Sequence, residues 1–141
     1  MKENYKSREK IFFDTNVFID SIDRDEPVPS SLLENAVAEN CAATSTVTVM
    51  EYCTGIFNEK NPASRTYFVN FLEENCVRVY PIDVDTAVFA AKLRGAHPSL
   101  RSMDALQLAS AAVHHCSAFY TNDRRLAGVD VPGVDIRLVE D

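Results

Sequence analysis

The chain has 141 residues, of which 46% are hydrophobic and 25% charged, and this size and composition predict a single domain over residues 1–141. Its apolar stretches are too short for a membrane-spanning helix, so we expect no membrane association. The net charge of −7 argues against non-specific affinity for nucleic acid, unless several acids gather in one pocket that holds divalent cations.

Short apolar runs alternate with helical patterns along the whole chain. In chain order, the predicted elements are a strand at 10–13, a helix at 17–24, a turn at 25–29, a helix opening at Ser31, a strand at 41–44, a helix opening at Asn61-Pro62, a strand at 77–82, a helix capped by Asp83 or Asp85, a helix opening at Ser102, and strands at 118–121 and 134–139. Strands that alternate with helices of this length predict an α/β fold with a parallel sheet covered on both faces.

Local signals support most of these elements and leave one open. Ser31 and Glu34 form a capping-box pattern ahead of an apolar run. The aromatic face of residues 67–72 predicts a core helix. The segment TSTVTVMEYCTG, residues 44–55, is ambiguous, because its β-branched residues favour a strand while its place before Gly55 suits a helix starting near Thr46 or Thr48.

Two of the predicted strands end in the same kinds of polar residue. Asp14 and Asn16 follow the first strand, whereas Thr121 ends the fourth and Asp123 follows it. In an open α/β sheet, ligands bind beyond the carboxyl ends of the strands, so these side chains could meet in one crevice. The alternative is that each acid merely caps the next helix, a position where Asp, Asn and Thr are favoured.

Two further acids lie in segments that are otherwise uncharged or apolar. Glu51 is the acid of the 41–57 segment, although Thr48-x-x-Glu51 also matches a structural capping box. Asp104 shares a helix face with Leu108, which directs its carboxylate toward the interior, but an acid in the first turn after Ser102 is also favourable by itself.

Acids that point inward together are unstable unless their pKa values rise or they recruit cations. Ligation by carboxylate oxygens alone suits Mg²⁺ or Mn²⁺. The four cysteines contain no C-x-x-C pair, and the adjacent His114 and His115 face different directions on a helix, so neither set predicts a zinc site. The charged first ten residues lack the apolar core of a secretory signal, so we expect a cytoplasmic protein.

The motifs FDTNVFID, TVMEY, SMDALQLASA and YTND resemble, in order and spacing, the signature of PIN-domain nucleases. The compact length most resembles the VapC-type toxins of toxin–antitoxin pairs. The resemblance covers residues 11 to about 138 and implies a three-layer α/β/α sandwich whose central parallel sheet has the strand order 3-2-1-4-5. The segment RRLAGV that follows Asp123 is less typical of the family.

By position, the resemblance implies an acidic set that binds one or two Mg²⁺ or Mn²⁺ ions and catalyses hydrolysis of RNA phosphodiesters. The implied metal-binding and catalytic residues are Asp14, Glu51, Asp104 and Asp123, with Asn16 and Thr121 in support. It further implies a VapB-like antitoxin as partner, a homodimer, and contact with DNA only through the antitoxin.

RNA phosphates require positive contacts outside such an acidic pocket. The candidates are Lys60, Arg65, Arg101, Arg124 and Arg125, any of which is otherwise an ordinary solvated surface residue. Competing readings are a PIN ribonuclease of RNA processing that is not a toxin, and a catalytically silent PIN-like binding scaffold. A phosphoacceptor signalling domain is a third, but it needs a Lys where this chain has Asn122 and Asp123.

Overall fold

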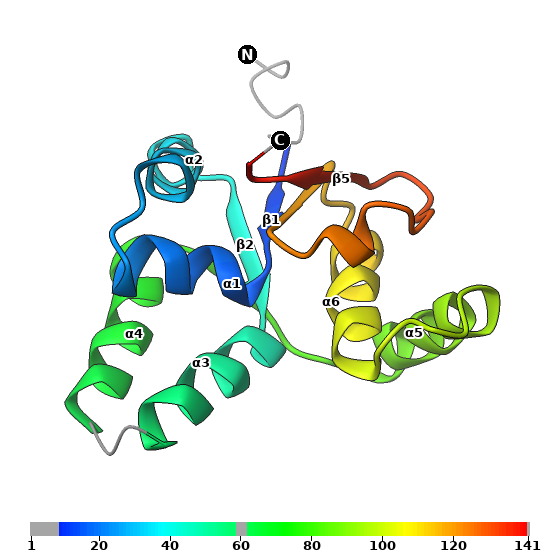
Figure 1. Cartoon of the computed structure of the whole chain (residues 1–141), viewed down its shortest axis with the longest axis horizontal. Helices are drawn as coiled ribbons and strands as arrows, with labels where there is room; N and C mark the ends of the chain where they lie inside the picture. The colour runs from blue at the N-terminus through cyan, green and yellow to red at the C-terminus, as the bar shows by residue number, and fades with distance from the viewer. Residues whose placement is uncertain (1–8, 59–61, 141) are drawn as a thin grey trace, which may run out of the picture.

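A five-stranded parallel sheet forms the centre of the computed structural model, which describes residues 9–58 and 62–140 (Figure 1). The strands are β1 (Ile11–Phe13), β2 (Ala42–Ser45), β3 (Arg78–Tyr80), β4 (Ala118–Thr121) and β5 (Asp135–Leu138). Their order is β3-β2-β1-β4-β5 and all neighbouring pairs are parallel, which confirms the predicted order.

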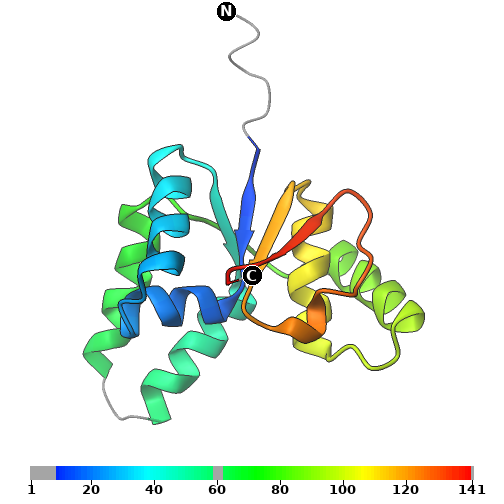
Figure 2. The same cartoon turned by 45° about the horizontal axis from the view of Figure 1, so that its top comes forward.

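Helices cover both faces of this sheet. They are α1 (Thr15–Phe18), the π-helix η2 (Ile19–Asp23), α2 (Pro27–Ala38), α3 (Thr46–Asn58), α4 (Pro62–Glu74), α5 (Val84–Ala96), α6 (Ser102–Val113) and the 3₁₀-helix η3 (Arg124–Leu126). Helices α1 to α4 lie on one side of the sheet and α5 and α6 on the other (Figure 2). The three-layer α/β/α sandwich is therefore confirmed.

The central strand β1 divides the core into two halves. Side chains alternate along a strand, so Phe12 faces the α5–α6 layer and Phe13 faces the α1–α4 layer, and neither is exposed to solvent. Each ring stacks on the neighbouring strand, Phe12 on Phe119 with centroids 5.2 Å apart and Phe13 on Tyr120 at 5.7 Å. Burial on both faces fixes the register and direction of β1.

The strand order reverses between β1 and β4, which is where this class of sheet binds ligands. The chain leaves β1 into α1 on one side of the sheet, whereas it reaches β4 from α6 on the other (Figure 1). At the carboxyl ends of the two strands the backbone N–H of Asp14 donates to the carbonyl of Tyr120 at 3.0 Å. The first acid of the sequence pattern therefore lies at this switch point.

The segment before α2 differs from the sequence prediction. The helix begins at Pro27, inside the predicted turn at 25–29, and Ser31 and Glu34 lie within it rather than forming a capping box. Proline suits the first turn of a helix, because its fixed φ is helical and its missing N–H is not needed there. The N-cap is Glu26, which makes no capping hydrogen bond through its side chain.

Three other boundaries are now defined. The ambiguous segment 44–55 is strand through Ser45 and helix from Thr46. The helix predicted from residue 17 begins at Thr15 and continues as the π-helix η2 to Asp23. Helix α6 begins at Ser102 as predicted, but the N-cap residue is Arg101, so Ser102 is not the cap.

Asp83 is the N-cap of α5, one of the two alternatives that the sequence left open. Its Oδ1 accepts hydrogen bonds from the backbone N–H of Thr86 at 2.9 Å and from the Thr86 hydroxyl at 2.8 Å. Replacing Asp83 by Ala removes the acceptor of both hydrogen bonds, so we expect the free energy of unfolding to fall in urea titrations. The matched control is Asp85→Ala in the same turn; an equal loss in both variants would contradict the cap assignment.

Within residues 9–58 and 62–140, no helix is long and apolar enough to cross a membrane.

Candidate functional site

Asp14 lies at the centre of the site, buried at the end of β1 with only 6% of its surface exposed. Its Oδ1 accepts the backbone N–H of Thr15 at 2.9 Å, so it caps α1 as the alternative reading expected. Its Oδ2 accepts the hydroxyl of Thr121, at the end of β4, at 2.8 Å. One carboxylate thus joins the two strands at the switch point.

Burial raises the pKa of Asp14 to about 6, despite these donors. The hydrogen bonds from Thr121 and Thr15 lower the pKa, whereas the charges of Asp104 and Glu51 raise it further. The side chain is therefore more than a helix cap, because it shares its electrostatic environment with two other candidate acids.

Glu51 is tied to Asp14 through Thr15. The Thr15 hydroxyl donates to Oε1 of Glu51 at 2.7 Å, while the adjacent backbone N–H donates to Asp14. The capping-box reading of Thr48-x-x-Glu51 is wrong, because α3 already begins at Thr46. Glu51 is thus directed toward the end of β1 rather than toward its own helix terminus.

Beneath the acids lies a buried polar network that the sequence analysis did not identify. Gln107, which is 1% exposed, donates through Nε2 to the Thr48 hydroxyl at 2.7 Å and to Oδ1 of Asp14 at 3.3 Å. Its Oε1 accepts the Ser45 hydroxyl at 2.6 Å. Gln107 follows Asp104 by three residues and so lies on the same face of α6, a spacing from which the sequence gives its side but not its partners.

Asn16 and Thr121, which the sequence analysis predicts as supporting residues, are hydrogen-bonded to each other. Asn16 Nδ2 donates to the Thr121 hydroxyl at 3.4 Å, and its Oδ1 accepts the backbone N–H of Asn122 at 3.1 Å. The side chain of Asn122 donates in turn to Asp20, a buried acid that also pairs with Arg24 at 3.1 Å. These contacts fasten the start of α1 and η2 to the loop after β4.

Asp104 approaches the group from the first turn of α6 and is partly buried. Burial raises the pKa of Asp104, and the charges of Asp123 and Glu51 raise it further, while Arg125 and Arg101 oppose the shift. The four predicted acids therefore interact electrostatically. The charges of Glu51 and Asp123 act on Asp104, and the charges of Asp104 and Glu51 act on Asp14.

Asp123 differs from the other three acids because it holds a basic partner. Arg125 donates to it through Nε at 2.9 Å and through Nη2 at 2.5 Å, a bidentate pair. These hydrogen bonds lower the pKa of Asp123. Asp123 also caps η3 by accepting the backbone N–H of Arg125 at 3.0 Å. Its carboxylate is therefore already compensated, in contrast to that of Asp14.

The donor set fits a hard divalent cation better than a soft one. Within the described ranges 9–58 and 62–140, no three His, Cys, Asp or Glu side chains form a ready-made cage for a metal ion. Mg²⁺ needs no such cage, because it keeps several waters and takes one or two carboxylates. Asp14, Glu51 and Asp104 supply carboxylate oxygens. Besides burial, the charges of Asp104 and Glu51 raise the pKa of Asp14, and the charge of Glu51 raises the pKa of Asp104, so a cation would relieve that repulsion.

Two of the five predicted basic residues border this group. Arg101 and Arg125 line a pocket next to Asp104, while the exposed Arg124 does not line it. Lys60 and the side chain of Arg65 lie outside the described residues.

The comparisons with known proteins agree with this geometry. The family model for the PIN domain matches residues 11–132. Among curated protein sequences, no significant match to this chain is found.

Several solved toxin–antitoxin structures share the fold. The structure of DNA-bound VapBC from Salmonella typhimurium contains a chain that is 18% identical in sequence to this one, with a TM-score of 0.76. The match covers 94% of this chain and 99% of that chain. A chain of VapBC2 from Rickettsia felis, bound to a promoter DNA fragment, is 16% identical with a TM-score of 0.75. The match covers 91% of this chain and 97% of that chain. A chain of a toxin–antitoxin complex from Klebsiella pneumoniae is 25% identical with a TM-score of 0.68. The match covers 89% of this chain and 95% of that chain.

Proposed function

This chain belongs to the PIN domain family, and from that premise we propose that it is a divalent-metal-dependent endoribonuclease acting as the toxin of a VapBC-type pair. PIN domains are in general nucleases, so the proposal concerns the substrate, the metal and the biological role. The proposed ligand set is Asp14, Glu51 and Asp104, with Asp123 as a fourth acid that must first release Arg125. Thr121, at the end of β4, donates to Oδ2 of Asp14, and Asn16 on α1 donates to the Thr121 hydroxyl.

The observation that carries the proposal is the burial of Asp14 at the switch point beside two other acids. An isolated buried carboxylate costs stability, and its pKa rises accordingly. A binding scaffold gains nothing from three mutually repelling acids, whereas a site for Mg²⁺ or Mn²⁺ uses such carboxylates as ligands. The network from Gln107 through Thr48 and Thr15 fixes Asp14 and Glu51 on rigid elements, as catalysis needs.

Bound there, one or two divalent cations would lower the pKa of a water and stabilise the charge on a scissile phosphate. The protein side chains then have distinct tasks. Thr121 and Gln107 orient the two oxygens of Asp14. The Thr15 hydroxyl orients Glu51 by donating to Oε1 of Glu51. The other oxygen of Glu51, Oε2, is then a candidate acceptor for a proton from the attacking water.

The structural neighbours support a proposal about the partner. Solved structures of VapBC bound to DNA share this fold over 91% and 94% of the chain. We therefore propose a VapB-like antitoxin that binds this chain, contact with DNA only through that antitoxin, and a homodimer of the toxin.

The test is cleavage of a mixed RNA pool by the purified chain. We expect cleavage with Mg²⁺ or Mn²⁺, none after treatment with EDTA, and recovery when either metal is added back in excess. Sequencing of the RNA ends gives the cleavage sites. Cleavage that persists in EDTA would contradict the metal requirement, and no cleavage of any RNA with either metal would contradict the nuclease assignment.

A further inference from the structure

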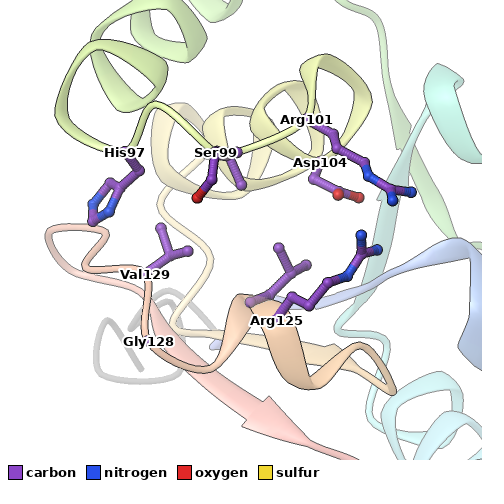
Figure 3. A pocket seen from close by; sticks show the side chains of 9 residues that line it. His97, Ser99, Arg101, Asp104, Arg125, Gly128 and Val129 are labelled. Atoms are coloured by element: carbon purple, nitrogen blue, oxygen red, sulfur yellow. The ribbon is translucent and has the colours of Figure 1, made fainter.

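A pocket of about 330 Å³ opens beside the acidic group, and its two ends differ in chemistry (Figure 3). At one end the side chains of Arg101 and Arg125 extend toward Asp104. At the other end lie His97 and Val129 (Figure 3). Its lining comes from the loop before α6, the start of α6, and the segment that begins at η3.

The charged end is continuous with the proposed active site. Asp104 belongs both to the acidic group and to the lining of this pocket. Arg125 is held by Asp123, while in the described part of the chain no carboxylate lies within salt-bridge distance of the Arg101 guanidinium. In a chain of net charge −7, two arginines beside the acids form a local site for an anion.

The other end suits a flat, partly apolar group. Leu100 and Leu126 are buried beneath it, being 6% and 2% exposed, and Val129 adds a third apolar side chain. His97 and Ser99 line the same space and offer hydrogen-bonding groups. A simple anion would not use the apolar lining, and a purely apolar ligand would not use the arginines. A nucleotide, with a phosphate at one end and a base at the other, uses both.

We propose that this side pocket binds one nucleotide of the RNA next to the phosphate that is cleaved, an inference that rests on the proposed nuclease function. Arg101 and Arg125 contact the phosphate, and the base lies between His97 and the apolar lining. The volume is near the lower end of the roughly 300–1,000 Å³ typical of small-molecule sites, so the pocket holds one nucleotide rather than several. It therefore selects the base beside the cleavage site.

The first experiment measures binding without metal and without cleavage. Backbone NMR spectra of the chain in EDTA are recorded during titration with the four nucleoside 3′- and 5′-monophosphates, with ribose 5-phosphate and with inorganic phosphate. We expect at least one nucleotide to shift the amide signals of residues 97–101 and 125–129 and to bind about tenfold more tightly than ribose 5-phosphate. Equal affinity for inorganic phosphate, or shifts confined to other residues, would overturn the proposal.

A pair of glycine variants tests the pocket itself. A Cβ at Gly128 or at Gly95 would meet no atom within 4 Å, so both positions have open space where a side chain would begin. Gly128 lines the pocket, whereas Gly95 is exposed on α5 and does not. Gly128→Leu is expected to weaken nucleotide binding and to raise the KM for RNA about tenfold with kcat little changed, and Gly95→Leu to change neither. Equal effects in the two variants would refute the assignment.

A charge pair provides the second test. Arg101→Gln is expected to weaken binding of the nucleotide and of inorganic phosphate alike, while Lys92→Gln, an exposed residue of α5 outside the pocket, is not. The assays also separate the two proposals. RNA cleavage without nucleotide binding in the pocket would refute the subsite and leave the nuclease standing. Nucleotide binding in the pocket without cleavage of any RNA would refute the nuclease and leave a nucleotide-binding site.

Discussion

Replacing Asp14 by Asn is expected to lower the rate of RNA cleavage at least a thousandfold while making the metal-free protein more stable. The rate falls because the amide is a weaker ligand for a hard cation and carries no charge. The fold is retained because Asn keeps the shape of Asp and one oxygen that can accept from Thr121 or Thr15. Most buried substitutions lower stability, so a gain together with a loss of activity distinguishes a site acid from a structural one.

The stability gain depends on pH in a defined direction. The folded-state pKa of Asp14 is about 6, above the ordinary 3.8, so the folded chain holds this proton more tightly than the unfolded chain. As pH rises from about 4 to about 6, the unfolded state ionises first and the stability of wild type falls. Above pH 6 the full penalty is present, about 3 kcal/mol by the free-energy equivalent of the shift.

Urea unfolding in EDTA at pH 4 and pH 7 measures this difference. Asp14→Asn should match wild type near pH 4 and exceed it by up to about 3 kcal/mol at pH 7. Adding Mn²⁺ should stabilise wild type and leave the variant unchanged, because only wild type retains the full carboxylate set. Asp85→Asn, on an exposed part of α5, controls for loss of charge alone. A variant less stable than wild type at pH 7 in EDTA would contradict the assigned role of Asp14.

The strands of the sheet, and the places of Asp14 and Asp123 next to two strand ends, were predictable because they depend on local patterns. The buried run before Asp14 and the matching run before Asp123 define two strand ends, and the topology rule for parallel sheets brings those ends together. The family resemblance then supplied the strand order. The start of α2 was predicted too late, because a capping-box pattern at Ser31 outweighed the simpler signal of proline at a first helical position.

Local patterns did not predict the pairing of Asp123 with Arg125, nor the hydrogen bonds of Gln107 beneath the acids. The bidentate contact between Asp123 and Arg125 depends on the tight turn of η3, whose short sequence carries no strong periodic signal. Gln107 and Ser45 meet across 62 positions of sequence, and only the packing of α6 on β2 brings them together. Periodicity identifies which face of a helix is buried, but not which polar groups meet there.

Gln107 provides the second large effect, because it joins the acids to the core. Gln107→Leu leaves the Ser45 hydroxyl without its acceptor and removes the donor to Thr48 and Asp14. At about 1–3 kcal/mol for each buried group left unpaired, we expect the free energy of unfolding to fall by about 2–4 kcal/mol. Groups that orient metal ligands typically contribute about 10–100-fold to metal affinity or activity, so cleavage should fall by that factor.

Two comparisons separate positioning from simple destabilisation. Gln107→Glu keeps the acceptor for Ser45 but places a second carboxylate against Oδ1 of Asp14, so the Mn²⁺ concentration for half-maximal cleavage and the pH profile should both change. Ser110→Ala removes a fully buried hydroxyl one turn further along α6, which has no hydrogen-bond partner among the described residues. Because nothing depends on that hydroxyl, we expect wild-type cleavage and unchanged or higher stability. If Ser110→Ala reduced cleavage as much as Gln107→Leu, the effect would belong to helix packing, and Gln107 would have no role in positioning Asp14.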